Sequence, residues 1–161
     1  MSVLRGMREL AVLLNRTPVP APHGIHAAYP PRDEELVRRL AADKDIAGRV
    51  GLTPRLAVGA ARTGEGVDVR LSWLNGEEPI GRRRAALAVR TLYDLATAGV
   101  MPEPCRVNVL CALREIGDPA RLLVGQAATL LGVRPVEVDG QVLVTRDVGP
   151  GVSYTVHGFL S

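Results

Sequence analysis

Residues 136–159 read VEVDGQVLVTRDVGPGVSYTVHGF, and this stretch decides the fold class. Apolar and polar side chains alternate along it with the two-residue period of half-buried β-strands. Asp139-Gly140 interrupts the alternation with a dipeptide that favours a type I′ hairpin turn, and the GPG at 149–151 supplies a second turn. The stretch therefore predicts a C-terminal three-stranded β-meander.

A helix is predicted immediately before this meander, over residues 118–132, with Asp118 as its cap and Gly132 closing it. Residues 121–138, RLLVGQAATLLGVRPVEV, resemble the first helix and turn of a MerR-type or excisionase-type helix-turn-helix. The resemblance implies a second helix of about two turns that reads DNA. However, PVEVDG (135–140) consists largely of β-branched and turn-forming residues, so we expect a strand there and no recognition helix after Gly132.

Further elements follow from the hydrophobic periodicity of the rest of the chain. Helical spacing covers residues 2–15, 33–51 and 80–98, and strand-like patterns cover residues 55–61 and 67–74. Residues 105–113, CRVNVLCAL, fit a strand by their β-branching and a helix by their length, and we favour the strand. The sequence thus predicts an α+β fold, with helices packed on an antiparallel sheet.

The prolines suggest a division of the chain into two parts. Residues 16–33 carry five prolines, which indicates an extended connector that is either a mobile linker or an arm laid across a partner. We therefore assign residues 1–32 to an N-terminal helix and proline-rich arm, and residues 33–161 to a single α+β domain. The first helix bears an apolar stripe that must be buried on its own domain or on another subunit. This stripe is the predicted partner-binding surface: Leu4, Met7, Leu10 and Leu14.

Three consecutive arginines, Arg82, Arg83 and Arg84, form the most unusual charge feature. They occupy the first turn of a predicted helix, where the positive end of the helix dipole disfavours cations by about 0.3–1 kcal/mol each. A bound anion offsets this cost, because free amides and guanidinium groups converge at such a turn. The alternatives are a solvated turn neutralised by acidic side chains, a phosphate or nucleic-acid site, and a contact with an acidic protein surface.

Catalytic and metal-binding patterns are largely missing from the sequence. Cys105 and Cys111 are the only cysteines and lie in an apolar run, as buried thiols do, and the sequence has no nucleophile elbow and no phosphate-binding loop. Three histidines, His23, His26 and His157, form a metal site only if the proline-rich arm folds back onto the last strand. We therefore predict no metal and no cofactor, and we assign no catalytic residue.

Composition narrows the function classes without selecting one. The formal net charge is +3, and only 3% of residues are aromatic, which disfavours a stacking surface for single-stranded nucleic acid. No window is apolar enough to span a bilayer, and the N-terminus lacks a signal-peptide pattern, so a cytoplasmic protein with reduced thiols is expected. We predict a non-catalytic interaction or assembly protein, with a protein partner or a homo-oligomer. The alternatives are a DNA-associated regulator with a degenerate winged-helix-like C-terminal half, and a small enzyme with a site not visible in the sequence.

Overall fold

The chain folds around one seven-stranded sheet with five α-helices packed on it, as seen in a computed structural model that describes residues 2–63, 66–74, 78–113 and 118–159. The helices are α1 (Val3–Arg16), α2 (Glu34–Ala41), α3 (Lys44–Val50), α4 (Arg82–Thr97) and α5 (Asp118–Leu131), with a 3-10 turn at Pro31–Asp33. The strands are β1 (Gly24–Tyr29), β2 (Thr53–Thr63), β3 (Gly66–Leu74), β4 (Arg106–Leu113), β5 (Val136–Val138), β6 (Gln141–Gly149) and β7 (Val152–Phe159). The predicted α+β class is therefore confirmed, as is the strand at residues 105–113.

The strands lie in the order β2-β3-β1-β4-β7-β6-β5. Every neighbouring pair is antiparallel except β4 and β7, which run parallel with Val107 opposite Val152. This parallel pair joins two antiparallel halves, a four-stranded one built from β1 to β4 and the C-terminal meander. After β4 the chain crosses through α5 to the outer strand β5 and then returns inward through β6, which brings β7 beside β4.

The C-terminal meander has the geometry that its sequence predicts. Asp139 and Gly140 have φ values of 49° and 76°, so both turn residues adopt the positive φ that a type I′ turn requires. Gly132 (φ 68°) ends α5, and the chain then enters β5. Within residues 132–159 no helix follows α5, so the recognition helix of a helix-turn-helix is not there to contact bases.

The proline-rich connector was only partly anticipated. Its residues 24–29 form β1, an inner strand that pairs with both β3 and β4. Prolines flank this interval without entering it, so every backbone N–H needed for the ladder remains. The preceding residues lie against the chain itself, because Tyr154 Oη donates a 2.6 Å hydrogen bond to the Pro20 carbonyl and the N–H of Ile80 donates to the Pro22 carbonyl.

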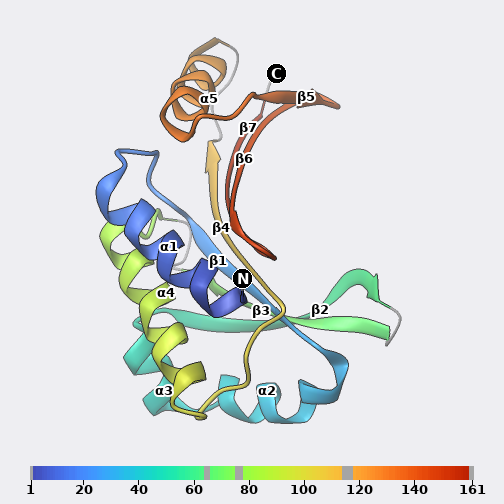
Figure 1. Cartoon of the computed structure of the whole chain (residues 1–161). Coiled ribbons are helices and arrows are strands. Elements are labelled where there is room, and N and C mark those ends of the chain that lie inside the picture. Colours follow the sequence, from blue (N-terminus) through green and yellow to red (C-terminus); the bar gives the residue numbers. More distant parts are fainter. Residues whose placement is uncertain (1, 64–65, 75–77, 114–117, 160–161) are drawn as a thin grey trace.

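The helices cover one face of the sheet. Alternate strand residues, among them Ile25, Leu71, Val109 and Tyr154, are buried beneath them. Figure 1 shows α1, α4 and α5 on the same side of the curved sheet, whereas none of the helices in the described part of the chain covers the opposite side. Strand positions on that opposite side carry polar residues: His26, Arg55, Arg70, Ser72, Asn108 and Ser153.

Two short helices complete the covered face. Asp43 restarts the helical segment at α3, because its carboxylate accepts hydrogen bonds from the N–H groups of Asp45 and Ile46. Asp33 holds the predicted cap position of α2, although its side chain makes no capping hydrogen bond. Among the described residues, no helix is long and apolar enough to cross a membrane.

Candidate functional site

The apolar stripe of α1 packs inside its own chain. Met7, Leu10 and Leu14 are fully buried, and Leu4 is half-buried against the same core. That core also contains residues from β1, α4, α5 and the meander, so α1 is part of the main hydrophobic core. The apolar stripe that was predicted to bind a partner is therefore covered by other parts of the same chain. The opposite face of α1 is exposed to solvent.

The three consecutive arginines separate into two roles. Arg82 Nη1 donates a 2.7 Å hydrogen bond to the Thr17 carbonyl, and Arg84 Nη2 donates a 2.6 Å hydrogen bond to the Gly51 carbonyl. These two contacts tie the start of α4 to the segment after α1 and to the end of α3. Arg83 is exposed, and its side chain has no partner among the described residues. Arg82 and Arg84 thus bind two different carbonyls, and of the three arginines only the Arg83 side chain remains without a partner among the described residues.

Arg83 lines a groove between α1 and α4. The two helices run side by side and antiparallel, with Arg82 at the start of α4 beside Thr17 just after α1. The groove has a volume of about 350 Å³ and is open to solvent. It is lined by Arg8, Ala11, Val12, Asn15, Arg83, Ala86, Leu87 and Arg90.

The apolar part of the groove lining includes two accessible side chains. Leu87 is 64% exposed and Val12 is 42% exposed, although both belong to well-packed helices. Ala11 and Ala86 are buried beside them and keep the two helix backbones close. Large aliphatic side chains that stay exposed within a concave surface are typical of binding grooves.

Three arginines, Arg8, Arg83 and Arg90, also line the groove. Arg8 from α1 and Arg90 from α4 lie over the ring of Tyr93, with their guanidinium carbons 5.9 Å and 5.5 Å from its centroid. A shared aromatic ring stabilises each cation but brings two like charges together. Asp94 is the nearby acid, 3.5 Å from Arg90, and this exposed pair contributes little. A second negative group in the groove is therefore favoured by the arrangement of Arg8, Arg83 and Arg90.

This groove was not predicted from the sequence, although each helix carries a signal for it. Val12 lies outside the apolar stripe of α1, and Leu87 lies outside the stripe of Ala85, Val89 and Leu92 on α4. An apolar residue on the polar face of each of two helices indicates a contact surface, but only the fold shows that these faces adjoin.

The uncovered face of the sheet holds a second polar arrangement. His26 Nδ1 lies 2.6 Å from Ser72 Oγ, and Asn108 Nδ2 donates to Ser153 Oγ and Thr155 Oγ1 at 2.8 and 2.9 Å. Burial and the positive charge of Arg70 lower the pKa of His26, which keeps the imidazole neutral near pH 7. The Ser72–His26 pair lies across adjacent strands, 46 residues apart in the chain, so no local motif could reveal it.

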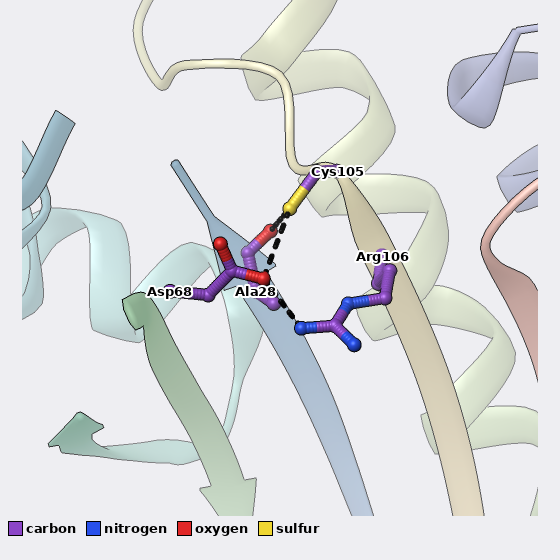
Figure 2. A network of polar contacts seen from close by, with 4 residues as sticks. All are labelled: Ala28, Asp68, Cys105 and Arg106. Atoms are coloured by element: carbon purple, nitrogen blue, oxygen red, sulfur yellow. Dashed lines mark hydrogen bonds and ion pairs between the residues drawn. The ribbon is translucent and has the colours of Figure 1, made fainter. Parts of the chain in front are cut away.

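A third cluster joins Asp68, Cys105 and Arg106, as Figure 2 shows. The buried Asp68 carboxylate accepts a 2.5 Å hydrogen bond from Arg106 Nη2, while Cys105 Sγ donates to the Ala28 carbonyl at 3.2 Å. Burial and the adjacent Asp68 charge raise the pKa of Cys105, so it remains a thiol at neutral pH. Burial also raises the pKa of Cys111 to about 12. Neither cysteine is an activated nucleophile in this arrangement.

His23 and His26 have partners within the described part of the chain. His23 Nδ1 accepts a 3.1 Å hydrogen bond from the Ala112 N–H, and His26 is bound to Ser72. No three His, Cys, Asp or Glu side chains within the described part of the chain are placed to hold a metal ion.

Comparison of the chain with protein-family models, with curated proteins and with solved structures gives no match.

Proposed function

We propose that this chain is a non-catalytic interaction protein that binds an acidic, amphipathic segment of a cytoplasmic partner protein in the α1–α4 groove. The observation that carries the proposal is that two exposed apolar side chains, Val12 and Leu87, line the same groove as three arginines. Helical segments with one apolar face commonly bind such grooves. The two free cysteines suit a reducing compartment.

The order of side chains on α4 specifies the partner further. Arg83, Leu87 and Arg90 stand at positions i, i+4 and i+7, on one face of the helix and spread over about 10 Å along its axis. A partner helix complements this face when it carries a large apolar residue with an acid one turn before it and another one turn after it. The apolar residue supplies buried area, and the acids pair with Arg83 and Arg90.

A synthetic peptide tests this proposal directly. The probe is a fluorescein-labelled, end-capped helical peptide of about 15 residues, long enough to populate a helix, with a leucine flanked at one-turn spacing by glutamates. Fluorescence anisotropy should show binding that weakens with salt. Leu87→Ser should weaken binding about tenfold, and Arg83→Ala several-fold, since about 1.4 kcal/mol corresponds to a factor of ten.

Arg70→Ala is the matched control, because Arg70 is an exposed arginine on the uncovered face of the sheet. Equal losses of peptide affinity in Arg70→Ala and Arg83→Ala would show that binding depends only on net charge. That result would contradict binding in the α1–α4 groove. A peptide with lysines in place of the glutamates should not bind. Duplex DNA added as a competitor distinguishes the nucleic-acid alternative: displacement by DNA that depends on Arg83 and not on Leu87 favours a phosphate site.

A further inference from the structure

The outer face of α5 is apolar and uncovered. Leu122, Leu123 and Leu130 are 64%, 39% and 47% exposed, whereas Val124 and Leu131 on the inner face are buried against the sheet. Figure 1 shows α5 at one end of the molecule, where it packs on β6 and β7 away from the other helices. Residues 122–131 contain no charged side chain. An exposed leucine face on a helix that already has its own inner stripe is unexplained by the fold.

The exposed side chains have a symmetric spacing. Leu122, Gln126 and Leu130 follow one another at four-residue intervals and so form one ridge along the helix, with Gln126 at its centre. A two-fold axis through Gln126 places Leu122 against Leu130 of a second copy, and Leu130 against its Leu122. The two Gln126 amides meet on the axis, where each amide has both a donor and an acceptor for the other. Such a self-complementary patch is what a two-fold interface requires.

We infer that α5 is the interface of a homodimer, in which two copies pack their Leu122–Gln126–Leu130 ridges against each other. Charge favours a second copy as the occupant. The chain has a net charge of +3, and an uncharged face is where two such chains meet with the least repulsion. The arginine-lined α1–α4 groove would repel itself, and it therefore stays free for another ligand.

The contact is expected to be weak and reversible. One helix pair buries less than the roughly 800 Å² per partner of a typical stable interface. We expect a dissociation constant of roughly 10 µM, so that monomer and dimer exchange within the accessible concentration range. The α5 face is separate from the α1–α4 groove, and the two surfaces share no residue.

Sedimentation velocity over roughly 1–300 µM protein provides the test. The wild type should shift from monomer to dimer, and Leu122→Glu combined with Leu130→Glu should remain monomeric over the whole range. Leu87→Glu is the matched control, because Leu87 on α4 is also 64% exposed. It should leave the dimer intact while it removes peptide binding in the groove. A wild type that stays monomeric, or a dimer that survives both glutamates, overturns the inference.

A disulfide cross-link locates the two-fold axis. Gln126→Cys in a Cys105→Ser background should form a covalent dimer under mild oxidation, because residues on the axis bring their Cβ atoms together. Thr97→Cys, exposed at the end of α4, serves as the control and should stay monomeric. Equal cross-linking of the two variants overturns the assignment of the axis. If the wild type is monomeric and is retained on neutral phosphatidylcholine vesicles, the homodimer inference is wrong. The leucine face of α5 would then bind lipid.

Discussion

Arg106 on β4 reaches across the intervening strand β1 to the carboxylate of Asp68 on β3, with 2.5 Å between Nη2 and Oδ2. The Asp68 side chain is 3% exposed, whereas the arginine is about half-exposed. The contact thus ties three neighbouring strands together and neutralises a buried charge.

Removing this guanidinium should cost more than removing a surface arginine usually does. Arg106→Ala leaves the buried Asp68 charge without its cation, and should lower the free energy of unfolding by about 2 kcal/mol. Arg70→Ala, an exposed arginine on the same face of the sheet, should change it by less than about 0.5 kcal/mol. Urea denaturation at neutral pH measures both. Equal effects of the two substitutions would contradict a specific role for the Asp68 contact.

Stability should fall as the pH drops below the ordinary histidine pKa of 6.5, in part because of His26. Burial and then Arg70 lower the pKa of His26 in the folded state, so below pH 6.5 the unfolded chain binds more protons than the native one. The free energy of unfolding decreases from pH 6.5 down to the folded-state pKa of His26, and His26 contributes no such decrease above pH 6.5. His26→Gln should remove this part of the pH dependence, measured by urea denaturation between about pH 7.5 and about pH 5.

The electrostatic cause can be tested separately by nuclear magnetic resonance titration. Arg70→Ala should raise the pKa of His26 toward its ordinary value. His157 is the internal control, because its pKa is lowered by burial and Arg70 is not among the causes. A His26 titration that is unchanged in Arg70→Ala would show that desolvation acts alone.

The α1 stripe should contribute to global stability. Leu10→Ala removes a fully buried side chain and should cost about 2–5 kcal/mol, whereas Leu4→Ala, at a half-buried position, should cost distinctly less. Thermal and urea unfolding of the two variants provide the comparison. If Leu10→Ala unfolds like the wild type, α1 is dispensable for the core.

Two glycines should respond to alanine in opposite ways. Gly151 has φ +72°, and an added Cβ would lie 2.6 Å from the Cys105 carbonyl oxygen, so Gly151→Ala should destabilise by at least about 1–2 kcal/mol. Gly48 lies inside α3 with no atom within 4 Å of an added Cβ, so Gly48→Ala should stabilise by about 0.5–1 kcal/mol. A shift in the same direction for both variants would contradict this difference in backbone geometry.

Local patterns in the sequence were sufficient for most elements and for the meander turn. The type I′ dipeptide Asp139-Gly140 adopts the expected backbone because its φ requirement is local. The strand β1 was missed because its alanines carry little β-propensity, and its place between β3 and β4 depends on partners about 45 and 80 residues away.

The candidate site was harder to predict for the same reason. The arginines at 82–84 stood out in sequence, but Arg82 and Arg84 are held by the carbonyls of Thr17 and Gly51, which only the fold brings near. The groove likewise depends on the antiparallel packing of two helices about 70 residues apart, and periodicity within each helix carries no information on its neighbour.

The parallel pairing of β4 with β7 also sets an order of events during synthesis on the ribosome. The amphipathic helix α1 is made first, yet it packs partly on β6 and β7, which emerge more than 120 residues later. The four strands β1 to β4 can associate while the chain is still growing. Until β7 is added, however, the apolar stripe of Met7, Leu10 and Leu14 lacks part of its surface. Part of this apolar stripe therefore stays uncovered on the growing chain until the last strand has been added, although α4, which α1 contacts most, emerges earlier.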